Sequence, residues 1–381
     1  MRVHRHSTFG LVVGLVAGAM VLSADVLSAR AGSAGQSQAA PKTGAELYID
    51  GCANCHGRDG KGLPDVNALL PVPVPDLTDC NFASREPDSD WTAIIHSGGP
   101  MRGFDRTMPA FGEVWSREEI AAALAHVRTL CGDPAWPRGN LNLPRALVTE
   151  KAYPEDEAVW STSIALDGPG EVVNELVYEH RFGARNQSEF KLPFAAAHEP
   201  DENWRFGAGD LAIGVKRAVY HNLDRGSIFS AAAELIVPIG DESAGAGSGL
   251  WKFEPFVSFG QIFGADSFLQ AQAGLELPFD VDAEREAFWR LVFGRTWTQG
   301  PNGFGRAWTP MVELVAARAL EADETTHWDL VPEVQITLNT RQHIMFNIGV
   351  RTPLNARAGR STRLLFYFLW DWFDGGLRDG W

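Results

Sequence analysis

From about residue 158 onward, apolar and polar side chains alternate along the chain with a period of two. In the run 268–277, for example, Leu269 and Ala271 lie on one face while Gln270 and Gln272 lie on the other. This alternation indicates β-strands with one apolar and one hydrated face. About twelve such runs follow one another, near residues 158–167, 172–183, 187–195, 208–219, 227–238, 251–262, 267–278, 286–298, 308–319, 328–339, 343–352 and 362–373.

Most of these runs exceed the roughly five or six residues of strands in soluble proteins, and they suit the tilted strands that cross a bilayer. Turn sequences such as Asp167-Gly168-Pro169-Gly170 separate them, as expected of hairpin-linked strands. We therefore predict an all-β, antiparallel, up-and-down barrel of about twelve strands over residues 158–381, in the outer membrane. A soluble β-sandwich is the alternative. Aromatic residues at the edges of the runs suit the two membrane interfaces: Trp160, Trp251, Phe268, Trp289, Trp308, Trp328, Trp370 and Trp372.

The first residues of the chain predict export. Arg2 and Arg5 precede an apolar run over residues 9–22, and residues 29–31 form a small-x-small cleavage pattern. We predict a signal peptide over residues 1–31. A retained membrane anchor is the alternative, although the apolar run is shorter than the roughly 20 residues of a spanning helix. The formal net charge of -15 argues against nucleic acid as a partner.

The segment Cys52-Ala53-Asn54-Cys55-His56 is a haem-attachment motif. Its two thiols can form thioethers with the haem vinyl groups, and the adjacent His56 is placed to be the proximal iron ligand. A redox dithiol or half of a zinc site is disfavoured by that histidine, by the single Cys-x-x-Cys and by the export signal. We therefore predict one covalently bound haem c.

The second axial ligand of the iron is sought downstream, among His96, Met101, Met108 and His126. Met108 is followed by Pro109, which stiffens a loop that can hold the thioether over the iron. We predict Met108 as the distal ligand, with Met101 as the main alternative. A thioether ligand raises the reduction potential and favours electron transfer over substrate chemistry.

Residues 42–131 are predicted to form a compact helical domain. Thr43 can cap a first helix and Ser116 a last one. Cys80 and Cys131 could form a disulfide if their Cα atoms lie within about 7 Å, or remain separate buried thiols. Two connecting segments flank the domain, a small-residue linker over residues 32–41 and a Pro-rich, extended connection over residues 132–157.

This helical domain resembles class I c-type cytochromes. The resemblance implies a fold of a few helices wrapped around a haem, which Cys52 and Cys55 attach. It also implies His56 and Met108 as the axial ligands. His126 departs from the Tyr or Trp that is usual in the last helix. The motifs that carry the resemblance are Gly44, Tyr48, Gly57, Gly60, Gly62, Met108-Pro109-Ala110-Phe111 and a final helix ending near Leu130.

The whole chain resembles cytochrome-porin fusion proteins of Gram-negative bacteria. We predict a monohaem one-electron carrier, not an enzyme, anchored at the outer membrane with its cytochrome domain facing the periplasm. It could also conduct electrons across or at that membrane. Its partners would be outer-membrane lipid and a periplasmic redox protein with a basic docking face.

Two alternatives stay open at this point. One is a soluble periplasmic oxidoreductase with a β-sandwich domain. The other is an outer-membrane channel or transporter with an accessory cytochrome module. In that case a polar lumen would be lined by Glu175, Glu179, Arg181, Glu333 and Arg351.

Overall fold

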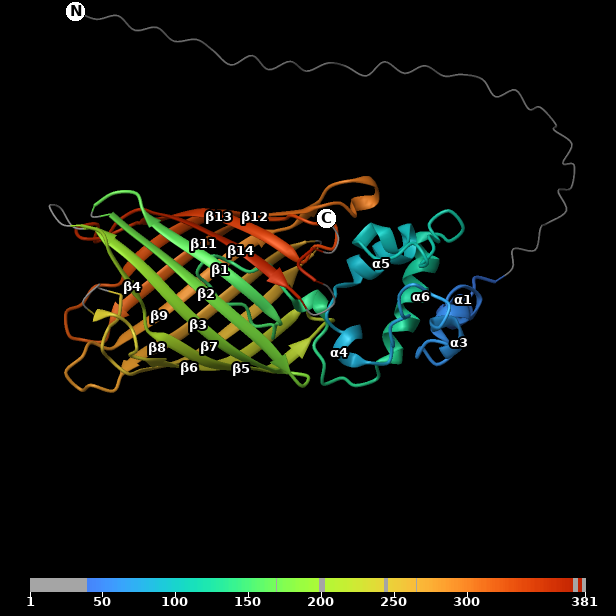
Figure 1. The fold of residues 1–381 in the computed structure, drawn as a ribbon, viewed down its shortest axis with the longest axis horizontal. Helices are drawn as coiled ribbons and strands as arrows, with labels where there is room; N and C mark the ends of the chain where they lie inside the picture. The colour runs from blue at the N-terminus through green and yellow to red at the C-terminus, as the bar shows by residue number, and fades with distance from the viewer. Residues whose placement is uncertain are drawn as a thin grey trace, which may run out of the picture. The chain divides into compact units, whose positions relative to one another are not determined.

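The computed structural model describes residues 40–168, 170–198, 203–242, 246–264, 266–372 and 376–378. The predicted signal peptide over residues 1–31 lies outside them, as do residues 32–39 of the predicted linker. The described residues form a helical domain followed by a β-barrel (Figure 1). None of the helices in this part of the chain combines the length and the apolar character that a membrane span requires. The helical domain contains α1 (Gly44–Gly51), α2 (Ala53–His56), α3 (Pro64–Asn67), α4 (Cys80–Ala83), α5 (Asp88–Ser97), η1 (Gly99–Arg102) and α6 (Arg117–Leu130).

The first and last of these helices begin where the sequence predicts. Thr43 caps α1 and Ser116 caps α6, each within a reciprocal capping box. In the first box, Glu46 N donates to Thr43 Oγ1 at 3.3 Å, and Thr43 N donates to Glu46 Oε2 at 2.7 Å. The two helices pack closely, because a Cβ on Gly44 would lie 2.1 Å from the Ala122 carbonyl oxygen. This approach requires glycine.

Twelve of the fourteen strands in the described residues form a closed antiparallel barrel, in which each strand pairs with its neighbours in the chain. The barrel closes where β1 pairs with β14, from Glu157 opposite Asp371 to Ala165 opposite Arg363. A sheet that closes on itself is not a sandwich of two sheets. The twelve strands are β1 (Glu157–Ala165), β2 (Gly170–Phe182), β3 (Asn186–His198), β5 (Leu211–Asn222), β6 (Ser227–Val237), β7 (Lys252–Phe263), β8 (Ser267–Pro278), β9 (Glu286–Arg295), β11 (Ala307–Ala319), β12 (His327–Thr337), β13 (Ile344–Pro353) and β14 (Arg363–Asp371).

These strands agree with the predicted runs to within a few residues. The predicted run 286–298 divides into β9 and the short β10 (Trp297–Thr298), which pairs with β11. A second short strand, β4 (Arg205–Ala208), pairs with β3 and was not predicted. Both lie beside the ring and leave its closure unchanged.

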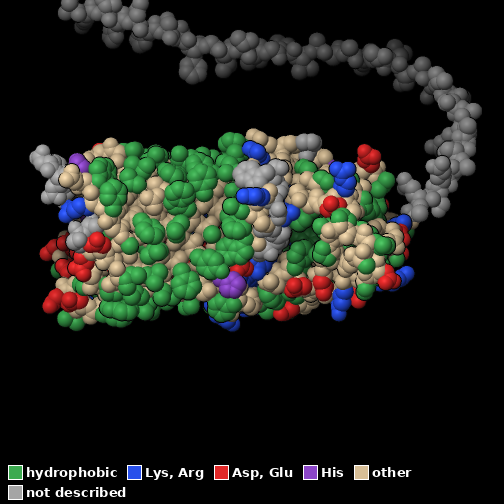
Figure 2. Space-filling view, in the orientation of Figure 1, with side chains coloured by type: hydrophobic (Ala, Val, Ile, Leu, Met, Phe, Trp, Pro, Cys, Tyr) green, Lys and Arg blue, Asp and Glu red, His purple; other side chains and the backbone are tan. Residues whose placement is uncertain are grey.

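The barrel is polar inside and apolar outside. On β2 the side chain of Glu179 is fully buried in the lumen, whereas Leu176 on the opposite face is 50% exposed. On β8, Gln270 and Gln272 are buried while Leu275 is exposed. Figure 2 shows apolar side chains covering the barrel wall, with charged side chains gathered towards its ends. Soluble proteins have an apolar interior and a polar surface. The reverse arrangement seen in this barrel is that of an outer-membrane barrel.

The prediction that aromatic residues at the strand edges lie at the membrane interfaces is correct in part. Trp160 is exposed on the outer wall, and Trp251 is exposed directly before β7. The prediction for Phe268 is wrong, because its side chain is 3% exposed and packs inside the lumen against Leu143 and Met311. The reason is the alternation itself, which places residue 268 on the same face of β8 as the buried glutamines at 270 and 272.

The turns differ between the two ends of the barrel. At the end that contacts the helical domain most connections are short, such as residues 183–185 between β2 and β3 and residues 223–226 between β5 and β6, whereas residues 296–306 between β9 and β11 are longer. At the other end, residues 199–210 join β3 to β5 and residues 238–251 join β6 to β7. Short turns are periplasmic and long loops extracellular in outer-membrane barrels. The helical domain therefore lies on the periplasmic side.

A charge placed on the outer wall tests the orientation of the strands. Leu176→Arg, near the middle of β2, should destabilise the barrel by about 2–4 kcal/mol, the usual cost of arginine at the bilayer midplane. Leu166→Arg is the control, because Leu166 is similarly exposed but lies in the loop after β1. Urea unfolding in lipid vesicles measures both variants. Equal stability of the two would contradict the assigned lipid-facing surface.

Candidate haem site and lumen plug

The haem-attachment motif lies at the junction of two helices. Cys52 joins α1 to α2, and α2 is followed by Gly57, whose φ of 75° favours glycine. The Tyr48 hydroxyl donates to the Gly57 carbonyl oxygen at 2.7 Å. This bond ties the end of the motif back to α1. Cys52, Cys55 and His56 are thus presented on one turn.

Both thiols of the motif are free, as attachment to a haem requires. Cys52 is buried in a core that includes Tyr48, Leu77 and Val127. Burial raises the pKa of Cys52 to about 11, and the neighbouring Cys55 adds to the rise. The Cys52 thiol is therefore protonated at neutral pH.

His56 has the protonation state of an iron ligand. Its Nδ1 is buried and finds no hydrogen-bond partner of normal geometry among the described residues. Burial lowers the pKa of the imidazole, and the Pro75 carbonyl opposes this effect. The ring is therefore neutral at neutral pH, which is the form that binds a metal. The residues present at this turn fit a covalently attached haem.

Met108 lies on the loop between η1 and α6, and glycines bring this loop against α5. Gly99 N donates to the Met108 carbonyl oxygen at 3.0 Å. A Cβ on Gly98, whose φ is 82°, would lie 3.0 Å from the same oxygen. Further along the loop, Phe111 packs at the end of α1, since a Cβ on Gly51 would lie 3.0 Å from its ring. The loop therefore lies against the helix that leads into the haem motif.

The three other ligand candidates lie in different surroundings. His96 Nδ1 lies 2.9 Å from Ser97 Oγ. The His126 ring lies 5.2 Å from the Tyr48 ring, so it occupies the aromatic position of the last helix. Met101 lies half-buried in η1. Met108 as the distal ligand stays a prediction.

Cys80 and Cys131 form a disulfide, with their Cα atoms 5.1 Å apart. The bond joins the first residue of α4 to the residue that follows α6. The chain leaves the helical domain shortly after it, so the disulfide fixes the point from which the next segment starts.

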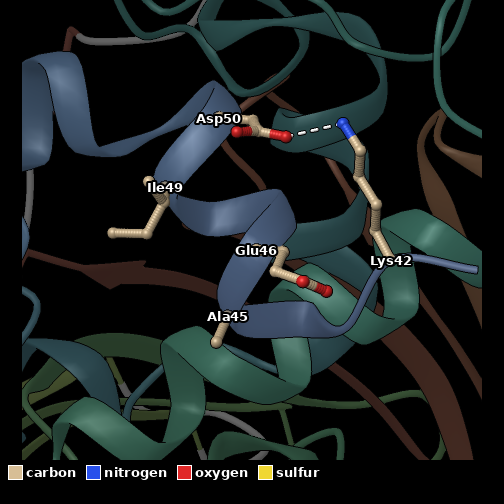
Figure 3. Close-up of a pocket in the computed structure, with 5 residues that line it drawn as sticks. All are labelled: Lys42, Ala45, Glu46, Ile49 and Asp50. Carbon is tan, nitrogen blue, oxygen red and sulfur yellow. Dashed lines mark hydrogen bonds and ion pairs between the residues drawn. The ribbon is translucent and has the colours of Figure 1, made fainter.

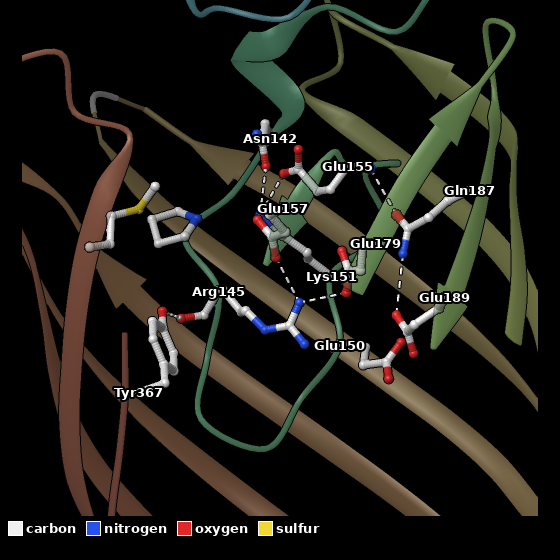
Figure 4. A network of polar contacts seen from close by, with 12 residues as sticks. Asn142, Arg145, Glu150, Lys151, Glu155, Glu157, Glu179, Gln187, Glu189 and Tyr367 are labelled. Atoms are coloured by element: carbon white, nitrogen blue, oxygen red, sulfur yellow. Dashed lines mark hydrogen bonds and ion pairs between the residues drawn. The ribbon is translucent and has the colours of Figure 1, made fainter. Parts of the chain in front are cut away.

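That next segment is not a simple connection between domains. After η2 (Gly139–Leu141), residues 142–156 run into the barrel lumen before β1 begins, and we call them the plug (Figure 4). Leu147 packs against Val159 and Tyr367 on the inner wall. The sequence predicts an extended stretch here, but not its position inside the barrel.

Wall side chains, rather than another strand, hold the plug backbone. The Glu313 carboxylate accepts from Val148 N and Thr149 N, both at 2.9 Å. Gln272 Oε1 accepts from Glu150 N at 3.1 Å. Other wall side chains donate to plug carbonyl oxygens: Gln270 to Pro144 at 2.8 Å, Tyr367 to Arg145 at 2.6 Å, Arg290 to Val148 at 2.9 Å and Lys216 to Lys151 at 3.1 Å.

The charged side chains of the plug are paired as well (Figure 4). Arg145 Nη1 lies 2.7 Å from a carboxylate oxygen of Glu157 and 2.7 Å from one of Glu179. Lys151 Nζ lies 2.5 Å from Glu155 and 3.2 Å from Glu157. All of these side chains are buried or nearly so. Because an unpaired buried charge is costly, this network favours one arrangement of the plug.

The residues predicted to line a polar lumen do lie there in several cases. Glu333 Oε2 accepts from Leu147 N at 3.0 Å. Arg181 Nη1 donates to the Tyr153 hydroxyl at 3.1 Å. Glu179 binds Arg145, Glu175 lies on the same face of β2, and Arg351 pairs with Asp329 of the wall at 2.6 Å.

Three buried carboxylates, of Glu150, Glu189 and Glu234, have oxygens within 4.8 Å of one another. Lys191 Nζ lies 2.8 Å from Glu189 and 2.8 Å from Glu234, and it also contacts Glu150. The ammonium supplies the positive charge that the carboxylates need. The cluster is therefore an ion network that joins plug and wall.

The outer side of α1 carries a shallow hollow of about 370 Å³, lined by Lys42, Ala45, Glu46, Ile49 and Asp50 (Figure 3). Lys42 Nζ pairs with Asp50 at 2.6 Å, and both side chains are exposed. Hydrogen bonds from Thr43 lower the pKa of Glu46. The hollow thus presents ionised side chains at the surface, and its lining contains no buried reactive group.

Comparisons with known proteins agree with this division of the chain. Residues 159–357, more than half of the chain, match the family described as putative MetA-pathway of phenol degradation. The chain belongs to this family. Residues 39–127 match the family described as cytochrome c oxidase, cbb3-type, subunit III. They form a cytochrome c domain, and the chain joins this domain to an outer-membrane-type barrel of the first family.

Among curated proteins, the gluconate 2-dehydrogenase cytochrome c subunit of Pantoea cypripedii is 33% identical over 106 residues, which cover 25% of this chain and 21% of that protein. The chain thus spans about a fifth of that relative. Among solved structures, an outer membrane channel from Pseudomonas putida F1 is 10% identical with a TM-score of 0.41, covering 60% of this chain and 99% of that one. The KdgM porin is 10% identical with a TM-score of 0.36, covering 56% and 98%.

Replacement of Glu313 tests how the wall holds the plug. Glu313→Leu leaves the amides of Val148 and Thr149 without their acceptor, and each stranded donor costs about 1–3 kcal/mol. We expect a lower unfolding midpoint in urea, measured in lipid vesicles. Glu313→Gln keeps an acceptor oxygen, so its unfolding midpoint should fall less than that of Glu313→Leu. Wild-type stability of Glu313→Leu would contradict the assigned contacts.

Proposed function

We propose that this chain is a one-electron carrier whose single haem c is anchored beside the periplasmic end of an outer-membrane barrel. Cys52 and Cys55 would hold the haem covalently, and His56 and Met108 would be its axial ligands. Support comes from two free thiols and a neutral imidazole on one turn. The bound haem supplies an iron centre that gains and loses one electron.

Residues around the motif position the two proposed axial ligands. The Tyr48 hydroxyl fixes the turn that presents His56. The packing of Phe111 at the end of α1 keeps the Met108 loop close to that turn. The apolar core around Cys52 shields the attachment side from water.

The observation that favours an anchor over the channel alternative is the plug. A lumen occupied by residues 142–156, with their backbone and charges bonded to the wall, is not an open path for solutes. This favours the barrel as an anchor over the channel alternative, which requires the plug to leave. The Cys52–His56 turn belongs to the helical domain, outside the barrel (Figure 1). We therefore propose that electrons are exchanged on the periplasmic side, and that passage to the cell exterior needs a further carrier.

We propose a periplasmic donor or acceptor with a basic docking face. The chain carries a formal charge of -15, and carboxylates such as Glu46 and Asp50 are exposed on the helical domain (Figure 3). Opposite charges speed encounter, and salt weakens this effect. The relative named as a cytochrome c subunit of gluconate 2-dehydrogenase suggests a dehydrogenase as the class of donor.

Substitution of the two methionines tests the ligand set. In the purified full-length protein, Met108→Ala should keep the covalent haem but lower its reduction potential, because the thioether ligand is lost. Met101→Ala should leave the potential and the absorption spectrum unchanged. Spectroelectrochemistry measures both, and Cys52→Ser with Cys55→Ser should abolish haem staining on denaturing gels. A spectrum changed by Met101→Ala and not by Met108→Ala would overturn the assignment.

A further inference from the structure

Two barrel segments contact one side of the helical domain. From the turn between β12 and β13, Arg341 Nη2 donates to the Gly103 carbonyl oxygen at 2.9 Å. The same guanidinium lies 4.4 Å from the centre of the Phe104 ring. From the segment between β10 and β11, the Phe304 carbonyl oxygen accepts from Arg102 Nη1 at 2.6 Å.

The contacts of Arg341 fall on the loop that carries Met108, and Arg102 directly precedes this loop. Phe104 N donates to the Gly99 carbonyl oxygen at 3.0 Å, and Gly99 N donates to the Met108 carbonyl oxygen at 3.0 Å. A Cβ on Gly99 would lie 2.2 Å from the Asp105 carbonyl oxygen, so the loop is closed tightly at this glycine. A force on Gly103 or Phe104 is therefore transmitted to the Met108 backbone.

The barrel also contacts α5, which holds the far end of the same loop. The Phe304 ring lies 5.3 Å from the His96 ring, edge to face. His96 holds the loop in turn, because its carbonyl oxygen accepts from Gly112 N at 2.9 Å. Gly112 also packs closely against the His96 ring, because a Cβ at this glycine would lie 2.6 Å from the ring.

Arg102 connects α5 to the barrel through a buried guanidinium. Its side chain is 4% exposed and donates to Asp90 Oδ1 at 2.9 and 2.7 Å, besides its bond to the Phe304 carbonyl oxygen. The carboxylate belongs to α5, whereas the carbonyl belongs to the barrel. The buried cation is thus satisfied jointly by both parts of the chain.

We propose that Arg341 and Phe304 are positioning residues for the distal axial ligand of the haem. The barrel restrains the Met108 loop and thereby determines how firmly the iron keeps its sixth ligand. This inference rests on the proposed function, in which Met108 is that ligand. Loops are mobile unless they are held, and a restrained loop loses less conformational freedom when its side chain binds.

The test uses the oxidised full-length holoprotein in lipid vesicles, with imidazole as a competitor for the sixth position. Arg341→Met should bind imidazole about tenfold more tightly, because a hydrogen bond from a charged group no longer restrains the loop. Its reduction potential should fall. Arg341→Lys should restore part of the difference, and Phe304→Leu should shift binding in the same direction.

Arg117→Met is the matched control. Arg117 Nη2 donates to Asn302 Oδ1 at 3.0 Å, so it contacts the same barrel segment from the start of α6, outside the Met108 loop. Its imidazole affinity should stay at the wild-type value. A change equal to that of Arg341→Met would mean that domain docking alone matters, and would overturn the proposal.

Heat-modifiable gel mobility establishes that each variant barrel is folded, and Phe304→Leu decides the test if Arg341→Met does not fold. Wild-type imidazole affinity in a folded Arg341→Met or Phe304→Leu protein would overturn the positioning role. A failure of the ligand assignment itself is distinguishable, because Met108→Ala would then leave the wild-type spectrum unchanged.

Discussion

The backbone of the plug finds its hydrogen-bond partners in the side chains of the barrel wall, and the rest of the structure depends on this. An irregular segment at membrane depth must have its peptide groups satisfied within the protein. Glu313, Gln272 and Tyr367 provide three of these partners. The polar interior thus serves to fix residues 142–156. Since the plug follows η2 directly, it also holds the cytochrome domain at the periplasmic end of the barrel.

The barrel was predictable from the sequence because its signal is local. Each strand shows its two faces within a few residues, and closure follows when the runs are paired in chain order. The plug gave no such signal, since its Pro-rich sequence lacks periodicity and its partners are far away in the chain, as with Val148 and Glu313. The apolar Leu143 and Leu147 were the available hint, because a linker surrounded by water would leave these leucine side chains exposed. The error for Phe268 is different in kind, because the local alternation of β8 already places it on the face of Gln270 and Gln272.

The Cys52–His56 turn could also be singled out from the sequence as the predicted haem site, because Cys52, Cys55 and His56 lie within five residues and each has a required role in haem attachment. The capped ends of α1 and α6 follow from equally local rules. The contacts around the Met108 loop were not predictable. Arg341 reaches a backbone carbonyl 238 residues away, and Arg102 reaches one 202 residues away. Every residue has a backbone carbonyl, so the sequence does not show which carbonyl an arginine will bind. Only the fold reveals these partners.

Ion conductance across a planar lipid bilayer tests the central claim most directly. The purified full-length protein, with its haem attached and its barrel folded, is inserted into the bilayer and recorded at the single-channel level. A lumen filled by residues 142–156 predicts that the wild-type protein stays closed, without a persistent open-pore current. A stable current of open-pore size from the wild-type protein would contradict the account, because the plug would then not occupy the lumen in the membrane.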